Sequence, residues 1–206
     1  MTGTIWLVFN RNNDDVLVTH SRDDGETWSP PKNITHQVKK PSWGWYATGP
    51  GHGIQLQSGR LLVACDHIQV ENYVHEDPIY SHVIYSDDHG ATWHIGGTVA
   101  AGTDECAVVE TTGGEVYINC RYEFSTKPRA VAWSTDNGNS FGEFAWDETL
   151  IDPVCQGSLV RFTTEARHGQ NRVLFSNPAS TSRDHMAVRI SYDECRTWSA
   201  GKVLHD

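Results

Sequence analysis

The sequence predicts an all-β protein made of repeated antiparallel sheets. An octet of the form Ser-x-Asp-x-Gly-x-Thr/Ser-aromatic recurs along the chain, and no segment shows the apolar period of a helix of ordinary length. The composition agrees, because the 206 residues include 18 Gly and 8 Trp and only 38% of them are hydrophobic. Such values are typical of sheets that are joined by many turns and packed through aromatic rings.

The four octets divide the chain into segments of similar length. They span residues 21–28 (SRDDGETW), 86–93 (SDDHGATW), 134–141 (STDNGNSF) and 191–198 (SYDECRTW). The octets start at residues 21, 86, 134 and 191, so the intervals are 65, 48 and 57 residues. Four short strands and their loops need about this length, which is one blade of a β-propeller. The sequence therefore predicts one β-propeller domain, residues 1–206, with between three and four blades.

Each octet has the residues of a tight turn. An Asp accepts hydrogen bonds from backbone N–H groups, and a Gly two residues later adopts positive φ without strain. We expect one Asp of each octet to close the turn, in a structural role: Asp23, Asp87, Asp136 and Asp193. Cys195 replaces the Gly in the fourth octet, so we expect a less stable or a different turn there.

Charge and cysteine content argue against several classes of protein. The formal charge of −10 disfavours a nucleic-acid partner, which needs a basic face. No apolar run approaches the roughly 20 residues that span a bilayer, and no signal peptide follows Met1. Secreted, lysosomal and cytoplasmic locations all stay open. The five cysteines are odd in number and lack the spacing of metal ligands, so we expect free buried thiols and neither metal nor cofactor.

Short apolar runs predict the first strands. Residues 4–9 and 16–19 form two strands ahead of the first octet. The segment 43–53 is dense in aromatic rings and glycine, which makes it a candidate for pocket lining, with packing between blades as the alternative. The strand 61–65 ends at Asp66, which faces either a site or solvent.

A hairpin in the middle of the chain brings opposite charges together. Residues 104–110 and 115–121 are two strands joined by a short turn, so Glu105 and Arg121 lie near each other at its open end. A structural salt bridge is the more frequent role of such a pair. Residues 138–142 match the Gly-x-Ser-x-Gly pattern of a hydrolase elbow, but no helix follows them.

The last quarter of the chain completes the pattern. Residues 153–162 and 172–178 contain two further strands, and the loop 179–184 leads to the strand 186–190 and the fourth octet.

The octets resemble the Asp-boxes of the sialidases (neuraminidases), and the resemblance covers essentially all 206 residues. Three further stretches carry it more specifically: 45–53 (WYATGPGHG), 104–105 with 119–121 (DE and NCR), and 175–178 with 182–183 (FSNP and SR). The resemblance implies a six-bladed propeller that removes terminal α-linked sialic acids from glycoconjugates by a retaining mechanism. It implies a Tyr nucleophile activated by a Glu, an Asp as acid/base, and three arginines that hold the sugar carboxylate.

The resemblance also implies roles for individual residues. Glu105 matches the Glu that activates the nucleophile, while Arg121 and Arg183 match the second and third arginines. Planar guanidinium groups suit a carboxylate, which they bind through two parallel hydrogen bonds. We expect the contacts with a sialylated glycan to come from five side chains: Arg121, Arg183, Asp66, Tyr46 and Gln156.

Three catalytic parts of the family have no match in this sequence. The first Arg and the acid/base Asp belong ahead of the first octet, and no matching segment precedes Trp6. The nucleophilic Tyr belongs after residues 204–206. We therefore expect residues 1–206 to be the middle of a sialidase catalytic domain with both ends missing, inactive by itself. The alternative is a sialoglycan-binding or scaffold propeller without catalysis. The sequence indicates no oligomeric state.

Overall fold

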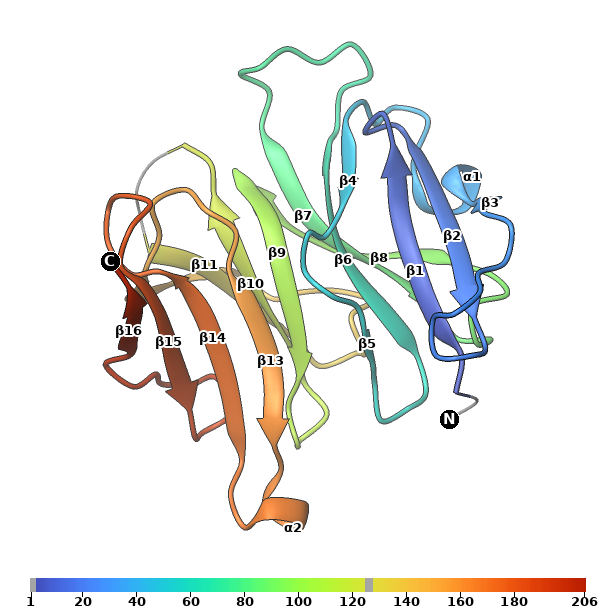
Figure 1. Ribbon diagram of the computed structural model, residues 1–206. Coiled ribbons are helices and arrows are strands. Elements are labelled where there is room, and N and C mark those ends of the chain that lie inside the picture. The colour runs from blue at the N-terminus through green and yellow to red at the C-terminus, as the bar shows by residue number, and fades with distance from the viewer. Residues whose placement is uncertain (1–2, 125–127) are drawn as a thin grey trace.

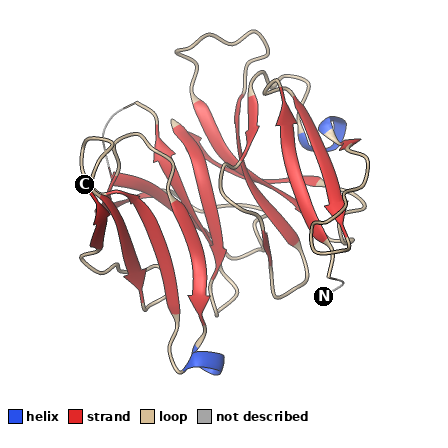
Figure 2. Ribbon diagram, in the orientation of Figure 1, coloured by secondary structure: helices blue, strands red, loops and turns tan. Residues whose placement is uncertain are grey.

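The protein, described here by a computed structural model over residues 3–124 and 128–206, is built almost entirely of strands (Figure 1). The described residues form four antiparallel sheets, which follow one another as blades of a β-propeller. The first sheet has three strands and the others have four or five, which confirms the prediction of between three and four blades. The helices of the described residues are two four-residue turns, α1 (Thr35–Val38) and α2 (Glu165–His168) (Figure 2). Neither is long and apolar enough to cross a membrane.

The strands of each sheet are consecutive in the chain. The first sheet contains β1 (Ile5–Arg11), β2 (Asp15–Ser21) and β3 (Lys32–Asn33). The second contains β4 (Tyr46–Thr48), β5 (Ile54–Gln55), β6 (Leu61–Ile68), β7 (Ile79–Ser86) and β8 (His94–Ala101). The third contains β9 (Thr103–Glu110), β10 (Val116–Tyr122), β11 (Pro128–Ser134) and β12 (Ala145–Ile151). The fourth contains β13 (Ser158–Thr163), β14 (Arg172–Pro178), β15 (Met186–Ser191) and β16 (Lys202–His205).

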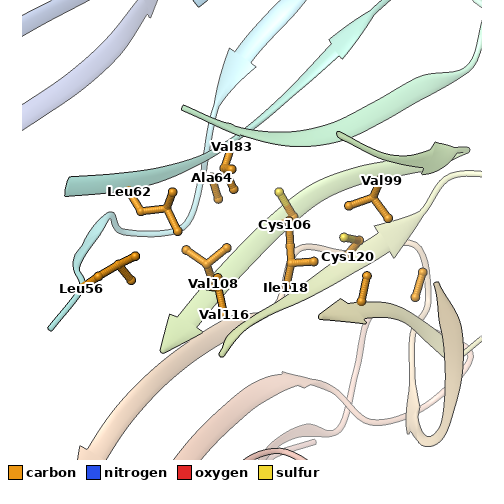
Figure 3. Close-up of a cluster of buried hydrophobic side chains, with 12 residues drawn as sticks. Leu56, Leu62, Ala64, Val83, Val99, Cys106, Val108, Val116, Ile118 and Cys120 are labelled. Atoms are coloured by element: carbon orange, nitrogen blue, oxygen red, sulfur yellow. The ribbon is translucent and has the colours of Figure 1, made fainter. Parts of the chain in front are cut away.

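The third sheet is buried on both faces. Successive side chains of a strand point to opposite sides, and here each of the two sets packs in a separate hydrophobic cluster. One set of its residues joins residues of the second sheet in the cluster of Figure 3: Leu56, Leu62, Ala64, Val83, Val99, Cys106, Val108, Val116, Ile118, Cys120, Ala130 and Ala132. The intervening residues Ala107, Val109 and Tyr117 pack toward the fourth sheet. Close packing on both sides fixes the position of the β9–β10 hairpin.

All five cysteines are free thiols, as the sequence predicts. Cys65, Cys106, Cys120 and Cys195 are buried, whereas Cys155 is only half-buried.

The octets lie in equivalent turns of the four sheets, each after a strand that ends with the Ser of the octet. The third residue of the octet is the acid that closes the turn. Its carboxylate accepts the backbone N–H and the hydroxyl of the residue four positions later, in four equivalent pairs: Asp23 with Thr27, Asp88 with Thr92, Asp136 with Ser140, and Asp193 with Thr197. Three of the four predicted turn acids are thereby confirmed.

The prediction for the second octet was wrong by one residue. Asp88 closes the turn, and Asp87, the second residue of the octet, lies outside the ring of hydrogen bonds. Both oxygens of Asp87 accept hydrogen bonds from the guanidinium of Arg60, at 2.7 and 2.8 Å. Arg60 also donates to the backbone carbonyl of Asn137 in the octet of the next sheet. Asp87 therefore contributes to contacts between blades.

Cys195 keeps the turn of the other octets, so of the two alternatives expected there, the different turn is excluded and the less stable turn remains. Its backbone N–H donates to the Ser191 hydroxyl at 2.8 Å, as Gly138 does to Ser134 in the third octet. Cys195 adopts a φ of +69°, a left-handed conformation that costs a non-glycine residue free energy.

Candidate functional site

The rim opposite the octets carries the residues that the resemblance points to. In the third sheet, Ser134 of the octet pairs with Val116 at the start of β10, whereas Arg121 lies at the other end of that strand. Arg183 lies in the loop before β15, while the fourth octet follows that strand. Both arginines thus lie on the rim opposite the octets.

Arg121 lies in a β-bulge. The register between β9 and β10 shifts between Cys120 and Tyr122, so two residues of β9, Asp104 and Glu105, stand opposite the single residue Arg121. Bulges re-aim side chains and are frequent next to active sites. Because of this bulge, two adjacent carboxylates reach one guanidinium.

The guanidinium of Arg121 uses two of its edges for these carboxylates. Nη1 donates to Oε2 of Glu105 at 2.7 Å, which confirms the predicted pair. Nε lies 3.1 Å from Oδ2 of Asp104, but its N–H is not aligned for a hydrogen bond, so this contact is an ion pair. About a quarter of the Arg121 side chain is exposed, at 23%. Among the described residues no acceptor contacts Nη2, which leaves this nitrogen for a ligand.

Burial shapes the electrostatics of this rim. It raises the pKa of Asp104, although the Arg121 charge acts in the opposite direction. Burial also lowers the pKa of Arg121, but the hydrogen bond to Glu105 and the charges of Asp104 and Glu105 more than offset this, so the net shift is upward. The guanidinium is therefore held in its charged form, ready for an anion.

A cavity of about 290 Å³ opens beside Arg121. Asp104 and Arg121 form one wall, and Trp45 and Tyr73 lie among its lining residues. The segment 43–53 thus contributes Trp45 to a pocket, in line with the interpretation of its aromatic rings. A flat ring beside a charged group is a common arrangement in sites that bind small polar ligands.

Arg183 lies on the same rim and is exposed. Its Nη2 donates to the backbone carbonyl of Val154 at 2.9 Å. The charges of Arg183 and Arg121 both act on the Cys155 thiol, whose pKa is nevertheless raised by burial. Arg183 thus contacts the loop that also holds Gln156, which is half-buried.

A buried arginine holds this loop from below. Nε of Arg129 donates to the Asn119 amide oxygen at 2.7 Å, and Nη1 donates to Asp152 at 3.1 Å. The Arg129 side chain is 0% exposed and the Asp152 side chain is 1% exposed. Nη1 also donates to the Cys155 carbonyl. This support was not predicted from the sequence, although Arg129 begins an otherwise apolar run (RAVAW), which is a signal for a buried charge.

Two of the predicted substrate contacts are not at the surface. The side chains of Tyr46 and Asp66 are 0% exposed. Tyr46, on the edge strand β4, packs in a buried cluster with Trp43, and Asp66 lies on β6, between β4 and β7. The Tyr46 hydroxyl is hydrogen-bonded to Nε2 of His82 at 3.0 Å. In this structure neither side chain can touch a ligand, which corrects the expectation for both residues.

The geometry agrees with comparisons to known proteins. The model of the BNR repeat-like domain matches residues 1–206. The chain belongs to the BNR repeat-like domain family. Among curated relatives, a sialidase of Micromonospora viridifaciens is 37% identical over 196 residues, which is 91% of this chain and 29% of that protein. An exo-alpha-sialidase of Aspergillus fumigatus is 38% identical over 194 residues, 93% of this chain and 43% of that protein.

Solved structures of sialidases share the arrangement of the sheets. A Hadza microbial sialidase has a TM-score of 0.87 and 33% identity, over 98% of this chain and 43% of that one. Trypanosoma rangeli sialidase in complex with the inhibitor DANA has a TM-score of 0.72 and 20% identity, over 92% of this chain and 35% of that one, and shows the fold alone. These findings confirm the resemblance to the sialidases. This member of the BNR repeat-like domain family spans less than half the length of these relatives.

Proposed function

We propose that this chain is the central part of an exo-α-sialidase, a glycoside hydrolase that removes terminal sialic acids from glycoconjugates with retention of configuration. The observation that carries the proposal is the Glu105–Arg121 pair in its bulge, with Arg183 on the same rim. The similarity to sialidases at 37% and 38% identity supports it. The substrate is then a sialylated glycan.

In this proposal the two arginines bind the carboxylate of the sugar. The free Nη2 of Arg121 and the exposed guanidinium of Arg183 offer planar donors for its oxygens. Gln156, on the loop between them, is the remaining predicted substrate contact. Charge-assisted hydrogen bonds of this kind are worth about 1.5–3 kcal/mol each, which is enough to select an anionic sugar.

Glu105 is the proposed base that activates a nucleophilic Tyr. Its carboxylate is partly exposed, at 29%, and lies 2.7 Å from the Arg121 guanidinium, so one charge pair joins substrate binding to catalysis. The Tyr, the acid/base Asp and the first Arg of the mechanism are proposed to lie outside residues 1–206. The isolated chain is then expected to bind a sialoside weakly and to release no product.

The test compares variants of the longer protein that contains this chain, using release of a fluorogenic sialoside. Glu105→Gln should lower kcat by at least about 10²-fold with little change in KM, because it removes a base and no contact with the carboxylate. Arg121→Lys should raise KM instead, since a point charge does not reproduce the planar fork.

A matched control comes from the octet rim. Glu115 and Arg196 form an exposed ion pair of the same residue types at 2.8 Å. Glu115→Gln and Arg196→Lys should leave both kinetic constants unchanged. Full activity of the Glu105→Gln variant contradicts the proposed mechanism. A longer protein that binds sialosides without cleaving them supports the alternative, a non-catalytic sialoglycan-binding propeller.

A further inference from the structure

Asp66 is a buried acid without a hydrogen-bond donor. Both of its carboxyl oxygens are shut off from solvent, and no N–H or O–H group of the described residues donates to them. An ionised carboxylate in such a place costs several kcal/mol unless it is paired. The usual solution is that the group keeps its proton. A neutral carboxyl then has one hydrogen to donate and needs an acceptor.

The candidate acceptor is the Asp104 carboxylate on β9. The two strands that carry these acids are in direct contact, because the Cys106 thiol of β9 donates to the Cys65 carbonyl of β6 at 3.4 Å. Ser81, the partner of Asp66 in the β6–β7 ladder, donates its hydroxyl to the backbone carbonyl of Asp104, so the two acids are neighbours in the fold. Burial raises the pKa of Asp66 well above its ordinary value, and the charges of Asp104 and Glu105 raise it further.

We propose that Asp66 carries a proton that it donates to the Asp104 carboxylate, and that Asp66 is thereby a positioning residue for Arg121. Asp104 has two oxygens to place. Oδ1 accepts the backbone N–H of Glu105 at 2.7 Å, and Oδ2 lies 3.1 Å from Nε of Arg121. A donor behind Asp104 fixes the plane of this carboxylate. Arg121 is then held by its Nε and Nη1 edges, and its Nη2 edge stays turned to a ligand.

The surroundings of Asp66 contain one cation and several groups that disfavour a negative charge on Asp66. The titratable and charged groups that interact electrostatically with it are Tyr46 of β4, Cys65 of β6, Asp104, Glu105 and Cys106 of β9, and Arg121 of β10. On β7 the neutral Ser81 is its partner in the ladder. Two carboxylates already exceed the charge of the single guanidinium. A charge on Asp66 would therefore be unpaired.

The first test measures the proton of Asp66 through stability. The unfolded chain releases this proton near pH 4, whereas the native state retains it, so above pH 4 the unfolded state binds fewer protons and wild-type stability falls as pH rises. Asn keeps a donor toward Asp104 and does not titrate. The unfolding constant of wild type relative to Asp66→Asn should therefore grow by up to about tenfold per pH unit above pH 4, until the native pKa is passed.

A surface variant provides the control for that test. Glu76→Gln removes one negative charge from an exposed loop and should show a constant difference from wild type over the same pH range. If Asp66→Asn also shows a constant difference from pH 4 to pH 8, Asp66 is ionised in the native state and the proposal is overturned.

The second test reads the position of Arg121 directly, without a ligand. In ¹⁵N NMR spectra of the chain, the Nε–H signal of Arg121 should keep its chemical shift and its slow exchange with water in Asp66→Asn. In Asp66→Ala the signal should shift and exchange at least about tenfold faster, because Asp104 is no longer fixed. If the Ala variant does not fold, Asp66→Ser, whose hydroxyl does not reach as far, replaces it with the same expectation. An unchanged signal in the folded variant overturns the positioning role.

The consequence for ligand binding rests on the proposed function. Sialic acid, titrated into the chain, should bind Asp66→Ala about tenfold more weakly than Asp66→Asn. If wild type does not bind sialic acid at all, the proposed function of Arg121 fails. The pH and NMR results still decide whether Asp66 is protonated in the native state and whether it positions Arg121.

Discussion

Asp88 and Asp104 lie on opposite rims of the same propeller, and the pKa values of their carboxyl groups move in opposite directions. Hydrogen bonds from Thr92, through its hydroxyl and its backbone N–H, lower the pKa of Asp88 to about 2. Burial raises the pKa of Asp104 in spite of the neighbouring Arg121. The octet acid is held in its charged form by a residue four positions away in sequence. The acid on the other rim depends on strands that meet only in the folded protein.

This difference separates the acids that close the octet turns from the acids that surround Arg121 in the candidate site. Repeated turns use carboxylates that are ionised, exposed and fully hydrogen-bonded, which contributes to stability and leaves little chemistry to perform. The opposite rim gathers carboxyls that are partly desolvated around one guanidinium, which is costly for folding and useful for binding an anion. Each of the following variants tests one side of this contrast.

The largest effect is expected beneath the rim with Arg121. Asp152→Ala leaves the guanidinium of Arg129, which is 0% exposed, without its charge partner. Breaking a buried ion pair in this way costs about 3–5 kcal/mol. Urea denaturation should therefore show a much lower midpoint for this variant than for wild type.

The exposed pair between Glu115 and Arg196 is the control for Asp152→Ala. Glu115→Gln should change the free energy of unfolding by less than about 1 kcal/mol. Equal midpoints for the two variants would show that the rim with Arg121 does not depend on the buried charge of Arg129.

A smaller effect is expected in the second octet, where two adjacent acids have different roles. Asp88→Ala removes hydrogen bonds to both the N–H and the hydroxyl of Thr92 and should cost about 1–3 kcal/mol. Asp87→Ala removes a partly exposed ion pair with Arg60 and should cost less than about 1 kcal/mol. Thermal unfolding of both variants measures the difference. A larger loss for Asp87→Ala would contradict the assignment of Asp88 as the turn acid.

The octets show how far local sequence determines structure. Their turns depend on contacts within eight residues, so the pattern predicted the turns, their place between strands and the number of blades. The error at Asp87 arose because two acids stand side by side, and only the register of the pattern tells which one faces the turn. The turn at Cys195 was expected to be less stable or different, and the hydrogen bonds of Ser191 and Asp193 keep the same turn with a non-glycine residue at positive φ.

The rim with Arg121 was predictable only in part. A hairpin brings its ends together by geometry, so the pair Glu105–Arg121 followed from the sequence. The bulge that adds Asp104 did not, because nothing in the residues of β9 and β10 marks a register shift. The burial of Asp66 was also missed, since a strand end is buried or exposed according to strands that are distant in sequence, here β9.

The smallest effect concerns the change in stability that the octet acids cause as pH falls. Its pH dependence is opposite to that expected for Asp66. The native pKa of Asp88, about 2, lies below its value of 3.8 in the absence of the turn. Below pH 4 the unfolded state therefore binds more protons than the native state. The stability that this carboxylate contributes is present above pH 4 and is lost as pH falls toward 2.

Asp88→Asn keeps one acceptor in the turn and removes the charge. The gap in thermal stability between wild type and this variant should therefore be widest at pH 5 to 7 and should narrow steadily toward pH 2. Over the same series, the stability of Asp66→Asn relative to wild type should increase as pH rises above 4. A gap for Asp88→Asn that stays constant down to pH 2 would show that its carboxylate is no better stabilised in the fold than in the unfolded chain. The contrast between the two rims would then rest on burial alone.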